Sequence, residues 1–310
     1  MARPFTITDT KINELVLRIP LFEDIRDIRL LGGGLTNRNY RVDTYKASYV
    51  MRVSDSTEGM LGINRHNERT NSARAHTAGV GAAVAFSLAE ENVLVIEWIE
   101  ASTLHAGDIH GNTGLLARMA ASLRQLHAGP AFEGDFYFPG IRRKYLQTVS
   151  SNNYFIPDRY LEMEQRVMQL EQLLGARPEQ RVPCNNDLLA ENFMDDGKKI
   201  WIIDYEYSGQ NEPSFDIGNL ASEIFLNEQD LVVLCDAYWQ KHLPSKIARA
   251  KAWSMIARFG WVLWASIQES VSSIDFDFRS WGLKKWHSVL TDLQGKQYTE
   301  LVQLLKQDIS

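Results

Sequence analysis

Three polar residues near the middle of the chain have the types and spacing that phosphoryl transfer requires. Asn192 follows Asp187 by five residues, and Asp204 comes after a further short stretch. A carboxylate can accept the proton of an attacking hydroxyl, while an amide oxygen and a second carboxylate can ligate Mg²⁺, a hard cation. In a phosphotransferase loop these are the roles of the first Asp, the Asn and the second Asp. On spacing alone a solvated turn is the commoner explanation, because Asp and Asn are frequent turn residues.

The segments around these three residues favour the chemical interpretation. Two short apolar stretches lie between residues 182 and 203, and 195–198 (Asp-Asp-Gly-Lys) separates them, which predicts a hairpin with a turn at its tip. The returning strand is apolar, and Asp204 falls where that strand ends. The sequence therefore predicts that Asp204 lies at the end of a strand beside the loop of Asp187.

The elements that must position these residues divide into a strand-rich first third and a helical remainder. Alternating and apolar stretches predict strands, with a glycine triplet between the first two, and apolar positions at helical spacing predict helices. We expect an α+β, bilobal plan, with an N-lobe over residues 1–98 and a C-lobe over residues 99–310. The expected strands are 28–31, 39–42, 49–53, 83–86 and 93–99, and the expected helices are 8–19 (Asp9 as its cap), 65–78, 112–127, 160–174 and most of the chain beyond 216.

Composition excludes several classes of protein. The 310 residues carry a net charge of −6, so no basic excess favours nucleic acid or an anionic membrane. Two cysteines cannot build a disulfide framework, which favours a reducing cytoplasm. No apolar tract approaches the roughly 20 residues of a membrane span. We expect a soluble cytoplasmic protein with a small-molecule partner, and the sequence leaves its oligomeric state open.

The central motifs resemble those of the choline/ethanolamine kinase family, within the aminoglycoside-phosphotransferase-like and protein-kinase-like folds. The resemblance extends over about residues 30–281 and is most specific in the C-terminal motifs. It implies an ATP- and Mg²⁺-dependent kinase in which Asp187 is the base, Asn192 and Asp204 ligate magnesium, and Asp216 anchors the catalytic loop. The residues that carry it are 184–187 (Cys-Asn-Asn-Asp), Asn192, 203–209 (Ile-Asp-Tyr-Glu-Tyr-Ser-Gly) and 215–219 (Phe-Asp-Ile-Gly-Asn).

One position departs from the family pattern. Asn185 stands where the family usually has His, at a position that mainly braces the loop. An Asn side chain also donates and accepts hydrogen bonds, so we expect an active loop.

The N-terminal third must supply the nucleotide site. The turn Gly32-Gly33-Gly34-Leu35-Thr36-Asn37 can bring backbone N–H groups close to phosphates, although glycine triplets also form plain turns. Arg52 stands where kinase-like folds place a cation on the third strand, and Glu68 is its expected ion-pair partner. A solvated Arg and a solvated Glu are the default alternative. The resemblance assigns ATP contacts to Gly34, Thr36, Asn37, Arg52 and Glu68, and to Glu97 and Ile99 at the hinge.

Tryptophan usage points to the substrate. Five of the eight tryptophans lie between Trp253 and Trp286, and Trp261 and Trp264 share one helix face. By spacing alone such aromatics are more often core, as we expect for Trp253 and Trp286. The resemblance instead implies a choline pocket, because a quaternary ammonium has no N–H and is best held by aromatic faces and a negative charge. That pocket comprises Tyr207, Glu223, Trp261, Trp264, Phe276 and Trp281, the last standing where Tyr is usual.

Rival functions remain open. A primary ammonium such as that of ethanolamine would need hydrogen-bond acceptors more than aromatic faces, and thiamine or an aminoglycoside would be a more distant substrate. A pseudokinase or nucleotide sensor has Asn185 as its only support. His127, His242 and His287 look isolated in sequence, which gives a metal hydrolase no basis.

Overall fold

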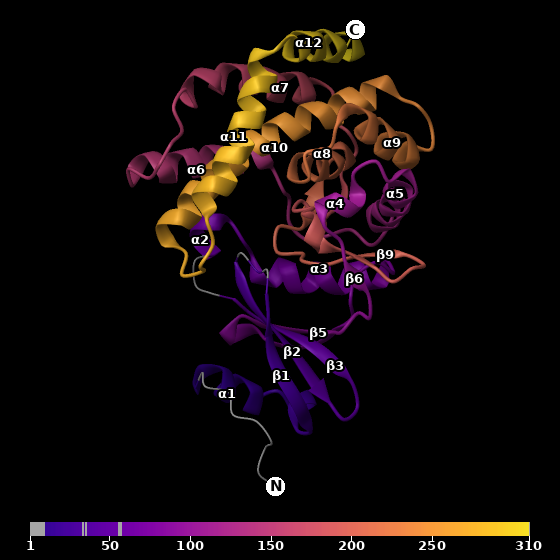
Figure 1. Cartoon of the computed structure of the whole chain (residues 1–310), viewed down its shortest axis with the longest axis vertical. Helices are drawn as coiled ribbons and strands as arrows, with labels where there is room; N and C mark the ends of the chain where they lie inside the picture. The colour runs from indigo at the N-terminus through magenta and orange to yellow at the C-terminus, as the bar shows by residue number, and fades with distance from the viewer. Residues whose placement is uncertain (1–9, 33, 35, 55–57, 310) are drawn as a thin grey trace.

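A computed structural model describes residues 10–32, 34, 36–54 and 58–309. Within them, the first part of the chain forms a five-stranded antiparallel sheet in the order β1-β2-β3-β5-β4. Apolar residues of β2, β3 and β5 pack against helix α1, which closes one face of the sheet (Figure 1). The strands are β1 (Ile25–Leu31), β2 (Asn37–Thr44), β3 (Ser48–Ser54), β4 (Val84–Leu88) and β5 (Val93–Glu97), and the helices of this part are α1 (Thr10–Leu17), α2 (Glu58–Leu61) and α3 (Arg65–Thr77).

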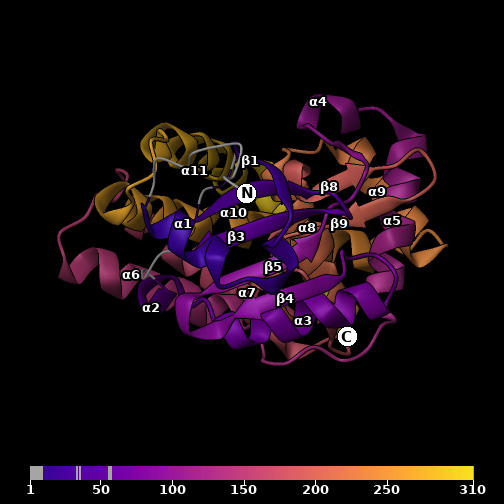
Figure 2. The same cartoon turned by 90° about the horizontal axis from the view of Figure 1, so that it is seen from below.

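Helix α3 connects the sheet to the rest of the molecule. It runs beside β4, as seen from below in Figure 2. Asn64 caps its first turn by accepting from the backbone N–H groups of His66 and Asn67. Two buried side chains then contact different parts of the chain, because Glu68 bonds to Arg52 of β3 and Asn71 bonds to Ser208. Helix α3 is therefore hydrogen-bonded both to the sheet, through Glu68, and to the helical part of the chain, through Asn71.

The remainder is mostly helical and lies at the other end of the long axis (Figure 1). The 28-residue helix α10 runs through its core and packs against α6, α8 and α11. Two small sheets, β7 with β10 and β6-β8-β9, carry the polar loops. The helices are α4 (Ala106–Ile109), α5 (Thr113–His127), α6 (Phe138–Ser151), α7 (Glu164–Ala176), α8 (Pro213–Glu223), α9 (Glu228–Trp239), α10 (Pro244–Val271), α11 (Phe278–Gln294) and α12 (Lys296–Ile309), and the strands are β6 (Ser102–Thr103), β7 (Val182–Cys184), β8 (Phe193–Asp195), β9 (Ile200–Ile202) and β10 (Gly209–Asn211).

Most of the expected elements are present. The predicted hairpin is β8 and β9, and its turn is closed by Asp196, whose carboxylate accepts from the N–H groups of Lys198 and Lys199. The structure adds five elements that the sequence did not predict, namely α2, α4, α6, β6 and β10. The predicted cap Asp9 lies outside the described residues, as do Gly33 and Leu35 of the glycine turn. The division between residues 98 and 99 stays a prediction. In the described part of the chain, no helix is both long and apolar enough to span a membrane.

Candidate active site

A cavity of about 940 Å³ lies between the sheet and the helical part, and it collects most of the predicted site residues. Asn37 and Glu68 do not line it and act through other side chains, as described below. The predicted residues in its wall are Gly34, Thr36, Arg52, Glu97, Ile99, Asp187, Asn192, Asp204, Tyr207, Glu223, Trp261, Trp264, Phe276 and Trp281. Residues that lie up to 247 positions apart (34 to 281) in the sequence thus share one cavity.

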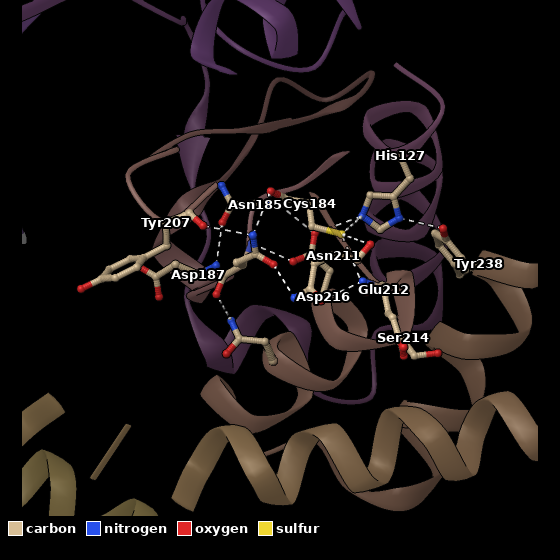
Figure 3. Close-up of polar contacts among 12 residues, drawn as sticks. His127, Cys184, Asn185, Asp187, Tyr207, Asn211, Glu212, Ser214, Asp216 and Tyr238 are labelled. Carbon is tan, nitrogen blue, oxygen red and sulfur yellow. Dashed lines mark hydrogen bonds and ion pairs between the residues drawn. The ribbon is translucent and has the colours of Figure 1, made fainter. Parts of the chain in front are cut away.

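The loop of Asp187 is held from below by a buried carboxylate. Asp216 stands in the first turn of α8, and its two oxygens accept the backbone N–H groups of Asn185 at 2.9 Å and Asn186 at 2.7 Å. Figure 3 shows Asp216 beneath the loop. Charge-assisted hydrogen bonds are about twice as strong as neutral ones, so this anchor fixes the loop backbone firmly. The predicted anchoring role of Asp216 is in agreement with this geometry.

Asn185 braces the loop from above. Its Nδ2 donates to the carbonyl oxygen of Asp204 at 2.7 Å, and its Oδ1 accepts the backbone N–H of Asp187 at 3.0 Å. A single amide therefore ties the loop of the predicted base to the loop of the predicted metal ligand. In addition, Asn192 donates from Nδ2 to the carbonyl of Asp187 at 2.7 Å, so its Oδ1 is the atom that would serve the predicted role of metal ligand.

Two residues of these loops have left-handed backbone conformations. Asn186 has φ of 67° and Asp204 has φ of 62°. Non-glycine residues rarely adopt this region, and Asn and Asp tolerate it best. The strain is maintained by surrounding hydrogen bonds, since Asn186 donates to the carbonyl of Tyr207 and accepts from Asn211.

The environment of Asp187 suits a proton acceptor. Burial raises the pKa of Asp187 well above its usual value, and the carboxylates of Glu223 and Asp204 raise the pKa further. A carboxylate with a raised pKa is a stronger base than one in water. In its ionised form, Asp187 would therefore accept a proton from a hydroxyl in the cavity more readily than an exposed aspartate would.

Arg52 connects the sheet to the loop of Asp204. Its Nη1 lies 2.6 Å from Glu68 Oε1, as the sequence predicted, and 2.7 Å from Asp204 Oδ1, which the sequence did not predict. Burial opposes the charge on Arg52, but the two carboxylates outweigh it and raise its pKa. The guanidinium is thus held in the cavity wall between β3, α3 and the end of the β9 hairpin.

Glu206 is a site residue that sequence reasoning missed. Its carboxylate accepts from the hydroxyl of Thr36 at 2.7 Å and from the amide of Asn37 at 2.9 Å, and Arg65 of α3 lies 3.2 Å away. The second and third residues after the glycine triplet are therefore tied to the loop of Asp204. Glu206 follows Asp204 by two positions in a motif that the sequence had already singled out, and this proximity was the available signal.

The far end of the cavity is aromatic. The rings of Tyr207 and Trp261 are 5.5 Å apart, those of Trp261 and Trp264 are 6.4 Å apart, and Trp281 lies 5.4 Å from Trp264. The polar edges are bonded within the protein, because Trp264 donates to the Tyr207 hydroxyl. Phe276 is 40% exposed and completes the wall. Trp253 and Trp286 are buried in the core, as predicted.

Glu223 does not stand alone in this wall. Lys285 of α11 donates to its Oε2 at 2.6 Å, so the negative charge that the sequence assigned to a substrate cation already has a partner. Sequence reasoning missed Lys285 because lysine is rarely buried. Its position four residues after Trp281, on the same helix face, was the available signal.

The expectation that His127 is isolated was wrong. His127 lies between the Tyr238 hydroxyl at 2.7 Å and Asp216 Oδ2 at 3.0 Å, with Cys184 Sγ at 3.8 Å (Figure 3). Helix α5 packs against β7 and α9, a long-range contact that sequence spacing does not reveal. His127, Cys184 and Asp216 could hold a metal ion by proximity alone. The hydrogen bonds of Asp216 and His127 already occupy these ligand atoms, so the cluster anchors the loop.

Comparisons with known proteins point to one family. The family model for choline/ethanolamine kinase matches residues 28–289. The protein LicA of Haemophilus influenzae is 26% identical over 250 residues, covering 76% of this chain and 72% of the relative. Among solved structures, a choline/ethanolamine kinase family protein from Mesorhizobium loti superposes with a TM-score of 0.85 at 26% identity, covering 96% of this chain and 98% of that one.

A second solved structure shares the fold. Choline kinase LicA from Streptococcus pneumoniae has a TM-score of 0.78 at 24% identity and covers 92% of this chain and 99% of that one. The sheet and the helical part thus form the bilobal, protein-kinase-like fold that the motifs predicted. Because the family match spans most of the sequence, the chain belongs to the choline/ethanolamine kinase family.

Proposed function

We propose that the protein phosphorylates the hydroxyl of choline, with ATP as donor and Mg²⁺ as cofactor. One observation carries this proposal: the cavity whose wall contains Asp187 is also lined by the neighbouring aromatic rings of Tyr207, Trp261 and Trp264. Aromatic faces attract a quaternary ammonium by about 0.5–2 kcal/mol each. A hydroxyl two carbons from that ammonium can then reach toward Asp187.

The residues present fit magnesium and a nucleotide. Asn192 and Asp204 offer an amide oxygen and a carboxylate in the cavity wall, which is the oxygen donor set of a hard cation. Held by these two side chains, Mg²⁺ would supply positive charge that offsets the negative charge of the nucleotide phosphates. Arg52 supplies a fixed positive charge near the same position, and Gly34 leaves room for backbone N–H groups to approach an anion.

The chain's own residues would perform the remaining steps. Asp187 would orient the substrate hydroxyl and accept its proton as the new oxygen–phosphorus bond forms, the bond from the terminal phosphorus of ATP to its bridging oxygen breaks, and ADP leaves. Asn185 and Asp216 hold the backbone of Asp187 in place. Glu97 and Ile99, at the end of β5, are the proposed hinge contacts for adenine. Catalysis then comes mainly from positioning and electrostatics.

The proposal is tested by measuring ADP release with choline, ethanolamine, thiamine and an aminoglycoside as acceptors. We expect the highest kcat/KM with choline, and Asp187→Asn should lower kcat by about 10²–10⁴-fold because the proton acceptor is lost. A melting temperature equal to that of the wild type would show that the variant is folded.

Two outcomes would redirect the assignment. If all four acceptors leave ATP turnover unchanged, a nucleotide-binding sensor explains the fold better. A higher kcat/KM with ethanolamine would favour the second candidate, an ethanolamine kinase, for which the carboxylate of Glu223 in the cavity wall is the supporting feature.

A further inference from the structure

A buried lysine stands directly behind the aromatic end of the cavity. Lys285 on α11 and Glu223 at the end of α8 form an ion pair at 2.6 Å, and each side chain is only 2% exposed. Lysine is almost never fully buried unless it is paired. Burial lowers the pKa of Lys285, while the attraction of Glu223 opposes this change. A charge kept in so costly a position suggests a role beyond packing.

The same ammonium lies against the aromatic wall. Its Nζ is 4.1 Å from the ring centroid of Trp281 and 5.7 Å from that of Phe225. Trp281 lines the cavity, so one of the rings assigned to the substrate cation already interacts with a cation of the protein. Lys285 therefore reduces both the negative charge and the aromatic surface that this side of the cavity offers.

The hydrogen-bond acceptors nearest to Lys285 in this wall already have partners within the protein. Glu223 uses Oε2 for Lys285, and its Oε1 lies 3.5 Å from the Ser222 hydroxyl. The Tyr207 hydroxyl accepts from the indole N–H of Trp264. A primary ammonium carries three N–H donors that must each find an acceptor on leaving water, whereas a quaternary ammonium carries none.

We propose that Lys285 is a specificity-determining residue: by neutralising Glu223 at the base of the aromatic cavity, it favours a quaternary over a primary ammonium substrate. It acts through Glu223 and is therefore a positioning residue. This inference rests on the proposed function and names the substrate class that the site selects. It also predicts what happens without Lys285, because Glu223 would then offer both oxygens to a substrate N–H.

The test is the ratio of kcat/KM for choline to that for ethanolamine in Lys285→Met. Methionine approximates the apolar stem of lysine without its charge. We expect the ratio to fall at least tenfold, mainly through a lower KM for ethanolamine. Lys285→Arg keeps the charge and should retain the wild-type ratio. Lys284→Met is the matched control, because this neighbouring lysine is exposed and lies over Phe225 at 4.7 Å.

A second neutral variant keeps the test decisive if Lys285→Met does not fold. Lys285→Gln retains a hydrogen-bond donor for the buried carboxylate, and it decides the question if Lys285→Met does not fold. An unchanged ratio in a folded neutral variant overturns the inference. If neither neutral variant folds, the pair is structural and the inference is likewise overturned.

The failure of this inference is distinguishable from that of the proposed function. Wild-type enzyme that phosphorylates neither amino alcohol overturns the proposed function, and the inference with it. Wild-type enzyme that prefers ethanolamine contradicts the inference while leaving the kinase intact. A wild-type preference for choline that survives loss of the Lys285 charge removes only the role of Lys285.

Discussion

Asn185 shows how one side chain can serve two loops. Its amide donates to the carbonyl of Asp204 and accepts from the N–H of Asp187, so the proposed base and the proposed metal ligand are positioned by the same group. A family-typical His at this position would also have one donor and one acceptor when neutral. Asn185 therefore makes the hydrogen bonds that hold the two loops together. Its presence in place of His no longer supports a pseudokinase.

Replacing Asn185 should consequently affect turnover more than binding. We expect Asn185→Ala to lower kcat at least tenfold with little change in the KM for choline, because the buried N–H and carbonyl groups lose their partner and the loop shifts. Loss of such a buried partner also costs about 1–3 kcal/mol of stability.

Steady-state kinetics with separate kcat and KM values check this, and Asn185→His is the matched comparison that should restore much of kcat. An Ala variant with wild-type kcat would show that Asn185 does not position the base.

At the scale of elements, the glycine turn between β1 and β2 is tied down through Glu206. Burial, together with the nearby carboxylate of Asp204, raises the pKa of Glu206 to about 7, although Arg65 and Arg52 act in the opposite direction. A carboxyl whose pKa is higher in the folded chain than its ordinary 4.5 binds its proton more tightly when folded. The tighter proton binding of Glu206 in the folded chain contributes fully to the free energy of unfolding below about pH 4.5, and this contribution is lost as the pH rises through about 7.

The metal-free protein should therefore lose stability relative to Glu206→Gln as the pH rises from about 5 to 8. The difference in free energy of unfolding between the two proteins should change by up to about 3 kcal/mol over this range. Denaturant unfolding in EDTA at several pH values measures it. Because Gln does not titrate, a constant difference across the range would contradict the raised pKa.

Two of the elements that the sequence did not predict, α6 and β10, were missed for physical reasons. Helix α6 has buried residues at helical spacing, but one of them is Arg142, which is 1% exposed and bonded to Glu164 and Glu171. A charged residue on the inner face hides the apolar stripe. Strand β10 is three residues long and exists because it pairs with β7, a tertiary contact that no local pattern encodes.

The residues of the candidate site also divide into those that the sequence predicted and those that it did not. Asp187, Asn192 and Asp204 stand close together in the sequence, and all three line the cavity. The partners of Glu223 and Glu206 could not be predicted, because they lie 62 residues away at Lys285 and 170 residues away at Thr36. Contacts of this range depend on how complete helices and strands pack.

At the scale of the whole molecule, Arg52 is a link between the two lobes. One guanidinium joins a strand of the sheet to Asp204 of the helical part and to Glu68 of the intervening helix. We expect Arg52→Lys to raise the KM for ATP about tenfold and to leave the KM for choline nearly unchanged, because an ammonium cannot reproduce the planar geometry of this contact.

Initial rates at varied ATP and at varied choline separate the two effects. Arg29→Lys is the control, since this arginine lies in the same sheet with about half of its side chain exposed (54%) and should leave both constants unchanged. Equal increases in both KM values would indicate general damage to the fold.

The left-handed backbone at Asp204 also has an evolutionary consequence. Two independent constraints limit the residue at this position. The left-handed backbone conformation favours glycine, asparagine and aspartate, and the proposed metal ligation requires a carboxylate. Of the three residues, only aspartate satisfies both constraints. A related protein that has lost the kinase activity would no longer need the carboxylate, but its backbone would keep the same conformation. We therefore expect such a protein to carry Asn or Gly at the position of Asp204.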